Sequence, residues 1–317
     1  MRAVEFADRL TFRHDWPDPK ATSQEAVVRV IRAGICRTDL EIVKGYMNFR
    51  GVLGHEFVGR VCQGPARWLD QRVVAEINCI CGHCDMCTGG LRNHCRKRTV
   101  LGIAGRDGAF ADKVLVPVRN LHPVPDGVSD DEAAMVEPLA AAFQLVHQIR
   151  FDKMQRVVVL GDGRLGQLVA RVLVRICPNV LLVGRHAEKL ALADRLHIQT
   201  VRVDEFTPRQ EADVVVEATG APAGLELACR TVRPRGTIAL KSTYAGRQPM
   251  SISGIVVDEI TVVGSRCGPF SDALDALARH EVDLSNLIGR HLPLEKAQEA
   301  FDLAARGDVV KVLFDVS

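Results

Sequence analysis

The sequence has no apolar run near the roughly 18 residues that a membrane-spanning helix needs, and it has no excess of charge of either sign. Lysine and arginine total 41 against 39 aspartates and glutamates, so there is no broad positive field to hold a nucleic-acid backbone. The first residues, MRAVEFADRL, lack the cationic-then-apolar order of a signal peptide. We therefore expect a cytoplasmic protein that binds neither nucleic acid nor a membrane.

The length of 317 residues exceeds what one small core usually organises, which predicts two domains. Short β-rich pieces separated by glycine, proline and polar clusters extend to about residue 135. A helical stretch follows from Met135, and five apolar strand segments then alternate with helical segments over residues 156–265. This alternation predicts a parallel sheet with both faces covered. The tail from Gly268 leaves the alternation, and we expect it to return to the first domain.

The cysteines are concentrated, because five of the ten lie between Cys79 and Cys95. Disulfide scaffolds are typical of short secreted chains, so this crowding indicates a metal site. The four that follow the spacing C-x2-C-x2-C-x7-C are Cys81, Cys84, Cys87 and Cys95. Four thiolates make a closed, structural zinc site, with a ferredoxin-like iron–sulfur site as the alternative. The neighbours that could substitute as ligands are Cys79, His83 and His94.

A second set of potential metal ligands is scattered along the chain. Cys36 lies in GICRTDLE, and His55 and Glu56 lie in GVLGHEFVG, each at the end of a β-rich piece. Glu137 lies where the helical stretch begins. A lone cysteine or histidine is more often a core residue. Three protein ligands with an open position, however, describe a catalytic zinc.

The segment RVVVLGDGRLGQLVARVLVRI joins a β-branched run to a helical pattern through the motif G-x-G-x-x-G. In this context the first glycine permits a tight turn, the second admits a pyrophosphate and the third allows close helix packing. The phosphate charge then meets the helix N-terminus. The predicted cofactor-binding residues of this loop are Gly161, Gly163, Arg164, Leu165 and Gly166.

About twenty residues later, where NAD-selecting enzymes place an acid, the chain has Gly184-Arg185-His186. Arg185, with His186 or Lys189, could pair with a 2′-phosphate, which favours NADP over NAD. The alternative is that Arg185 is only a solvated loop cation. Three further residues at strand ends are predicted to line the cofactor cleft, namely Thr219, Lys241 and Ser242. Two alternatives stay open for Lys241: it contacts the substrate or the nicotinamide, or it points to solvent.

Together, Cys-x-Thr-Asp, Gly-His-Glu, the cysteine quartet, Glu137-Pro138 and G-x-G-x-x-G occur in the order seen in zinc-containing medium-chain dehydrogenases. The chain resembles this family over essentially its whole length, and most closely its polyol, threonine and sugar dehydrogenase branch. The resemblance implies an α/β chain with a GroES-like β-rich catalytic domain over 1–148 with 267–317. A Rossmann domain with a doubly wound parallel sheet is implied over 149–266. It further implies a homodimer or homotetramer built through the sheet edge near TVVGS.

The resemblance also implies roles for single residues. The direct ligands of the catalytic zinc would be Cys36, His55 and Glu137. Glu56 would either bind the metal in place of water or stay just outside its ligands. Asp39 matches the aspartate that hydrogen-bonds the ligand histidine, and Thr38 matches the hydroxyl that passes the substrate proton outward. Glu41 stands where a second relay histidine often occurs, either as a relay or as a surface residue.

We therefore expect a zinc-dependent oxidoreductase with two zinc ions per chain. It would transfer hydride between a secondary alcohol or polyol, or the matching carbonyl, and NADP. One alternative is an NAD-linked threonine or polyol dehydrogenase. Another is a non-catalytic cofactor-binding protein with the same fold, which would have no need of the set Cys36, His55 and Glu137.

Overall fold

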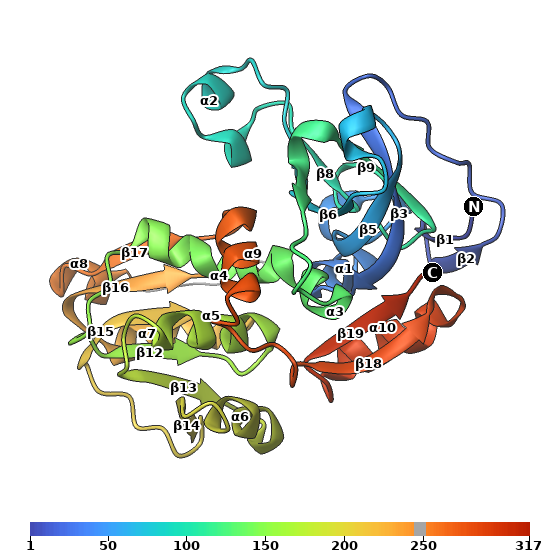
Figure 1. Cartoon of the computed structure of the whole chain (residues 1–317). Helices are drawn as coiled ribbons and strands as arrows, with labels where there is room; N and C mark the ends of the chain where they lie inside the picture. The colour runs from blue at the N-terminus through green and yellow to red at the C-terminus, as the bar shows by residue number, and fades with distance from the viewer. Residues whose placement is uncertain (244–251) are drawn as a thin grey trace. The chain divides into compact units, whose positions relative to one another are not determined.

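The computed structural model describes residues 1–243 and 252–317 (Figure 1). The chain divides into two compact units, a first unit of Met1–Glu137 with Phe270–Ser317 and a second unit of Pro138–Pro269. In the described residues, no helix is long and apolar enough to cross a membrane.

The first unit is built around a mostly antiparallel sheet in which β3 is central. Its strands, in the order of the sheet, are β11 (Leu121–Pro123), β6 (Arg72–Ala75), β5 (Glu56–Gln63), β3 (Glu25–Gly34), β19 (Lys311–Asp315) and β18 (Ile288–Pro293), with β10 (Lys113–Pro117) also paired to β3. The chain's tail thus supplies β18 and β19, and β19 pairs antiparallel with β3. The β-branched runs of β3 are buried, which explains their strand conformation.

Two smaller sheets and several short helices complete the first unit. The small sheets contain β2 (Leu10–Arg13), β1 (Ala3–Phe6) and β4 (Gly51–Val52), and β7 (Asn78–Cys79), β8 (Thr99–Leu101) and β9 (Gly105–Arg106). The α-helices are α1 (Arg37–Val43), α2 (Asp85–Thr88), α3 (Asp130–Ala133), α9 (Phe270–Ala278) and α10 (Ala297–Arg306). The 3₁₀ turns are η1 (Tyr46–Asn48), η2 (Ala66–Trp68), η3 (Arg92–His94), η4 (Val118–Asn120) and η5 (Leu294–Lys296).

The second unit is a doubly wound parallel sheet with helices packed on it, which confirms the predicted fold class. The described strands lie in the order β14 (Gln199–Arg202), β13 (Val180–Gly184), β12 (Val157–Leu160), β15 (Ala212–Glu217), β16 (Val232–Leu240) and β17 (Thr261–Gly264). The helices are α5 (Arg164–Val174), α6 (Ala187–Asp194), α7 (Ala223–Thr231) and α8 (Ser253–Val257). The chain starts at β12, winds outward to β14 and then crosses to β15. This reversal is where such sheets bind ligands.

Two features of the fold differ from the sequence analysis. The strand β14 was not expected, because its residues QTVR are only half-buried or exposed and form no apolar run. The helix α4 (Val136–Gln148) continues into the second unit, whereas the predicted boundary lay after residue 148. Contacts within the second unit explain this, since the ammonium of Lys241 donates to the carbonyl of Ala141 on α4 at 2.7 Å.

Candidate functional site

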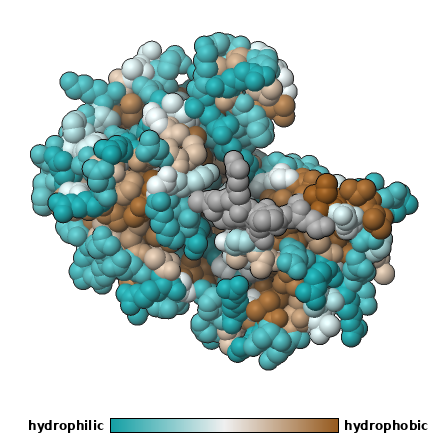
Figure 2. Space-filling view, turned by 180° about the vertical axis from the view of Figure 1, so that it is seen from behind, coloured by the Kyte–Doolittle hydropathy of each residue, from teal (hydrophilic) through white to brown (hydrophobic). Residues whose placement is uncertain are grey.

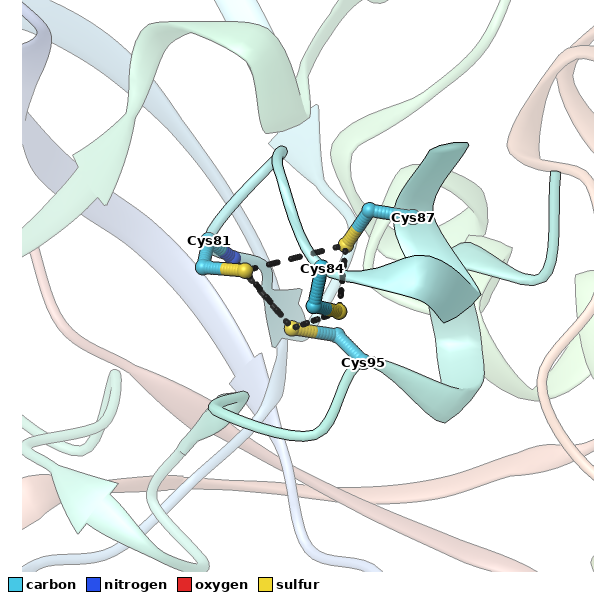
Figure 3. A group of neighbouring side chains, drawn as sticks. All are labelled: Cys81, Cys84, Cys87 and Cys95. Atoms are coloured by element: carbon cyan, nitrogen blue, oxygen red, sulfur yellow. Dashed lines mark hydrogen bonds between the residues drawn. The ribbon is translucent and has the colours of Figure 1, made fainter. Parts of the chain in front are cut away.

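Four cysteine sulfurs of the first unit converge on one point (Figure 3). The fold places two of them on α2, with Cys84 at its N-cap and Cys87 within it, while Cys81 follows β7 and Cys95 ends η3. Neighbouring sulfurs lie 3.5 to 4.0 Å apart. A tetrahedral zinc with Zn–S bonds of about 2.3 Å would hold its sulfurs about 3.8 Å apart. The four residues therefore fit a closed zinc site.

Backbone amides favour the thiolate form of part of this set. Amides of Arg96 and Cys87 lower the pKa of the Cys84 thiol to about 6. The amide of His83 lowers the pKa of Cys81. Desolvation raises the pKa of Cys87 to about 12, so this thiol needs a bound cation to ionise. Two thiols that ionise readily, beside a third that ionises only next to a cation, form a group suited to bind a cation.

The three possible substitute ligands lie outside the cysteine quartet. Cys79 is buried with its sulfur 3.8 Å from the carbonyl of Ile77, and burial raises its pKa to about 11. His83 is exposed and its ring nitrogen Nδ1 lies 3.0 Å from the carbonyl of Cys81. His94 is exposed on η3. The C-x2-C-x2-C-x7-C spacing thus singled out the group that the structure brings together.

A second group of potential ligands forms where β3 ends and β5 begins. The two strands pair antiparallel, with Gly34 opposite Glu56. Cys36 lies just after the end of β3 and His55 just before the start of β5, so both residues lie at the same end of this strand pair. Ligand atoms of Cys36, His55 and Glu56 all lie within 4.8 Å of one another. His55 and Glu56 are 3% and 0% exposed, which shields the group from bulk water. Strand register thus assembles residues that are twenty positions apart.

Asp39 lies beside both Cys36 and His55. It lies in the first turn of α1, where its Oδ2 accepts a hydrogen bond from the backbone amide of Cys36 at 2.7 Å. Its Oδ1 lies 3.3 Å from Nδ1 of His55. A carboxylate beside Nδ1 leaves the other ring nitrogen available to a metal.

The protonation of His55 depends on the same neighbours. Burial lowers the pKa of His55, but the charges of Asp39 and Cys36 raise it more, so this pKa lies well above its usual range. Metal binding requires the neutral ring, so protons and a metal compete for this site.

Lys311 is a charged residue of this site that the sequence analysis did not identify. It begins β19, is 1% exposed, and its ammonium forms an ion pair with Glu56 and donates to the carbonyl of Ile35 at 3.1 Å. Burial lowers its pKa to about 8, against the raising effect of Cys36 and Asp39. A Cβ on Gly34 would collide with this ammonium, so a larger residue at this strand end would displace the Lys311 side chain. The available signal was a lysine inside the apolar run VVKVLF.

The other predicted residues of this site are placed less closely. Thr38 Oγ1 lies 3.7 Å from the Cys36 sulfur, beside the ligand group. Glu137 is half-buried in the first turn of α4 and is not part of the close group of Cys36, His55 and Glu56. Glu41, whose side chain is 16% exposed, forms ion pairs with Arg37 at 3.0 Å and Lys44 at 3.3 Å, and the relay and surface interpretations both stay predictions.

The glycine-rich loop of the second unit joins β12 to α5 with the geometry of a dinucleotide site. Gly161 has φ of +113°, and a Cβ on Gly166 would lie 1.8 Å from the carbonyl of Gly161. A Cβ on Gly163, by contrast, would meet nothing within 4 Å. Gly163 is the N-cap of α5 and offers no side-chain cap to the helix amides. The open space beside Gly163, at the start of the helix, suits a pyrophosphate.

The end of β13 carries the predicted Arg185 and His186, both exposed. Lys189 is buried, and its carbonyl accepts a hydrogen bond from Gln167 at 2.7 Å. An acid does lie next to this turn, contrary to expectation, because Asp162 reaches it from the glycine-rich loop. The position of Asp162 between two glycines was visible in the sequence, but its neighbours across the sheet were not.

The loops after β15 and β16 are joined by a second buried acid that the sequence analysis missed. Glu217, 2% exposed, accepts hydrogen bonds from the hydroxyls of Thr219 at 2.6 Å and Ser242 at 3.0 Å. The hydroxyl of Ser242 in turn accepts from the amide of Gly220 at 2.8 Å. Thr219 and Ser242 are therefore held together at the carboxyl edge of the sheet, where cofactors bind.

Lys241 has a different environment from both alternatives considered for it. It is 8% exposed, and its ammonium donates to Ala141 O at 2.7 Å, Arg266 O at 3.1 Å and Ser265 Oγ at 3.2 Å. Three acceptors match the three donors of an ammonium. Direct contact with a cofactor would require breaking these bonds, so the geometry supports a structural role.

Comparison with known proteins gives consistent matches along the chain. Residues 22–126 match the alcohol dehydrogenase GroES-like domain, and residues 132–316, more than half of the chain, match the glucose dehydrogenase C-terminus. A sorbitol dehydrogenase from Halalkalibacterium halodurans is 30% identical over 94% of this chain and 93% of its own. A D-arabitol-phosphate dehydrogenase from Enterococcus avium is 29% identical, over 97% and 94%. A zinc-binding dehydrogenase from Sinorhizobium meliloti, solved with NADP, is 26% identical, with a TM-score of 0.90 and 99% of both chains covered.

Proposed function

The chain belongs to the zinc-type medium-chain dehydrogenases, which makes it an NAD(P)-dependent alcohol dehydrogenase, and from this premise we propose its substrate class, cofactor and metal content. The enzyme oxidises a secondary alcohol or polyol, or reduces the matching carbonyl, with NADP as hydride carrier. Each chain holds two zinc ions, one structural and one catalytic. Relatives named for sorbitol and for arabitol phosphate support polyols as the substrate class.

The observation that carries this proposal is the group of Cys36, His55 and Glu56, in which the last two are buried and the ligand atoms lie within 4.8 Å of one another. A thiolate, an imidazole and a carboxylate suit zinc, and fewer than four fixed protein ligands leave room for substrate. When bound, zinc acts as a Lewis acid, which makes an alcohol's proton easier to remove and a carbonyl easier to reduce. As the resemblance implies, Glu137 is the third direct ligand beside Cys36 and His55, and Glu56 either binds the metal in place of water or stays just outside the ligands.

The chain's own residues supply positioning and proton movement. Asp39 orients His55 and holds the backbone of Cys36, so two ligands depend on one carboxylate. Thr38 lies beside the Cys36 sulfur, where its hydroxyl can accept the substrate's proton and pass it outward. Lys311 forms an ion pair with the carboxylate of Glu56, which fixes the direction of this side chain.

Three observations support NADP over NAD. Arg185 is exposed at the end of β13, where a 2′-phosphate is recognised. The acid nearest to it, Asp162, already accepts hydrogen bonds from the protein. The similar zinc-binding dehydrogenase from Sinorhizobium meliloti was solved with NADP.

The proposed oligomer is a homodimer or homotetramer formed through the edge of the second unit's sheet. In the described part of the chain, β17 pairs on one side only, with β16. Figure 2 shows apolar atoms gathered where α8 and β17 lie. The exposed residues there are Ile252, Val256, Val257 and Val262. Sedimentation should give an even-numbered species, and Val262→Asp should shift it toward the monomer, since an exposed apolar edge strand favours pairing.

A cytoplasmic location is part of the proposal, because the cysteine quartet can bind a metal only while its thiols stay reduced. Fractionation of cells should recover the protein with cytoplasmic markers. Recovery from an oxidising compartment would contradict this placement.

The function is tested by screening zinc-replete protein against polyols, polyol phosphates, amino alcohols and simple secondary alcohols. Each substrate is offered with NADP or NAD, and nicotinamide absorbance is followed. We expect turnover with polyols and a higher kcat/KM with NADP. Turnover of threonine with NAD would select the NAD-linked alternative. Silence across all substrates, with zinc bound at both sites, would favour the non-catalytic alternative.

A further inference from the structure

Asp162 is a buried acid inside the glycine-rich loop, at a position where this loop needs no carboxylate to bind a pyrophosphate. It stands between Gly161 and Gly163 and is only 6% exposed. A buried carboxylate is costly unless its oxygens accept hydrogen bonds. Its partners therefore indicate what it does.

These partners all lie in the turn between β13 and α6. Asp162 Oδ2 accepts from the backbone amides of Arg185 at 2.7 Å and His186 at 2.6 Å. The ring nitrogen Nδ1 of His186 lies 3.0 Å from the same oxygen and 3.2 Å from Oδ1. One carboxylate thus ties the glycine-rich loop to Arg185 and His186, the two residues that the proposed function assigns to the adenosine ribose.

Gly184, the last residue of β13, is matched to this arrangement. A Cβ at Gly184 would lie 2.4 Å from the Cβ of Asp162 and 2.6 Å from its Oδ2. A residue with a side chain would therefore displace the carboxylate from the amides of residues 185 and 186. The end of β13 and the loop after β12 thus carry residues that fit each other at this point.

We propose that Asp162 is a positioning residue that sets the preference for NADP, an inference that rests on the proposed NADP-linked function. By fixing the backbone of Arg185 and His186, it holds the cationic turn ready for a 2′-phosphate. Its own oxygens are occupied by protein donors, so it is withheld from the ribose hydroxyls that an NAD-selecting acid would bind.

The test compares dissociation constants of NADP and NAD for the full-length, zinc-replete enzyme and its Asp162→Ala variant by calorimetry. NADP and NAD share the same pyrophosphate, so the ratio of their dissociation constants reports on the ribose end of the cofactor. We expect the constant for NADP to rise roughly tenfold, the effect of losing charge-assisted hydrogen bonds, and that for NAD to rise less than about threefold. Asp162→Asn, which retains one acceptor oxygen, should fall between wild type and alanine.

Gly184→Ala is an independent variant that displaces the same carboxylate without removing it, and it should lower the preference for NADP in the same direction. Asp194→Asn, an exposed acid on α6, is the matched control and should change neither constant. A rise for NAD that exceeds the rise for NADP would identify Asp162 as a ribose-binding acid and overturn the proposal. Equal rises would reduce it to a loop-folding residue and also overturn it.

Failure of the proposed function gives a different pattern. If wild type binds NAD more tightly and Arg185→Ala changes neither constant, the NADP preference itself is wrong. The Asp162 inference fails separately, when wild type prefers NADP and loses affinity on Arg185→Ala but keeps its preference in both Asp162 variants.

Discussion

The two candidate metal sites of the first unit are built in opposite ways. The cysteine quartet lies within 15 residues of one loop, and its ligands are a single chemical type. The group of Cys36, His55 and Glu56 combines three ligand types, buried at strand ends, and depends on Asp39 and on Lys311 from the far end of the chain. A closed, local site stabilises a loop, whereas a site that does chemistry needs oriented ligands and fixed charges around them.

The largest expected effect is the difference in activity between a variant of each site. Cys36→Ser should lower kcat/KM by roughly a thousandfold or more, because several kcal/mol of charge stabilisation are lost with the metal. Cys84→Ser in freshly purified protein should stay within about tenfold of wild type, since its site has no open position. Steady-state kinetics on the best polyol checks both. A similar loss in both variants would break the comparison.

The next effect concerns the buried charges that only the second group has. Lys311→Met should lower the free energy of unfolding by about 3–5 kcal/mol, because Glu56 is then left buried without its partner. Adding Glu56→Gln should recover much of this loss, since no unpaired charge remains. Urea denaturation of wild type, Lys311→Met, Glu56→Gln and the double variant measures the coupling energy between the two residues. A loss of unfolding free energy below about 1 kcal/mol in Lys311→Met would argue against a tightly coupled pair.

A smaller effect is expected at the residue that orients the histidine. Asp39→Asn should reduce zinc affinity at the second group or activity by about 10- to 100-fold, as is usual for partners of metal ligands. Competition with a chelator and kinetics measure it. Asp8→Asn, an exposed acid of the same unit, is the control. An unchanged zinc affinity and kcat would show that His55 is oriented without this carboxylate.

The smallest effect is expected in the cysteine loop. Asp85 and Arg96 form a two-pronged ion pair with both distances 2.6 Å, but both side chains are more than half exposed. Exposed pairs contribute at most about 1 kcal/mol, so Asp85→Asn should leave the melting temperature and zinc content nearly unchanged. Loss of zinc from this variant would show that the loop depends on charges as the buried site does.

The same contrast explains what could be predicted from the sequence. The quartet could be predicted because its ligands are close in sequence, so their spacing determines the geometry of the site. The same holds for the motif of Gly161, Gly163 and Gly166. Cys36 and His55 became convincing only together and through the family resemblance, because strand register brings them together. The parallel sheet followed from buried apolar runs, while the half-buried β14 gave no such signal.

The residues that the sequence analysis missed share one property. Lys311, Asp162 and Glu217 are buried charged residues, and each has a partner on another strand or loop. Their residue types are visible in the sequence, but their partners depend on strand order and register. Lys241 illustrates the same limit, since only the structure shows its ammonium turned toward carbonyls of α4 and residue 266.

Metal analysis of wild type, Cys36→Ser and Cys84→Ser, side by side with activity, tests the division of labour between the two sites most directly. We expect about two zinc ions in wild type and about one in each variant, with activity lost only in Cys36→Ser. One zinc in replete wild type, or full activity in a Cys36→Ser protein that has lost a zinc, would contradict it.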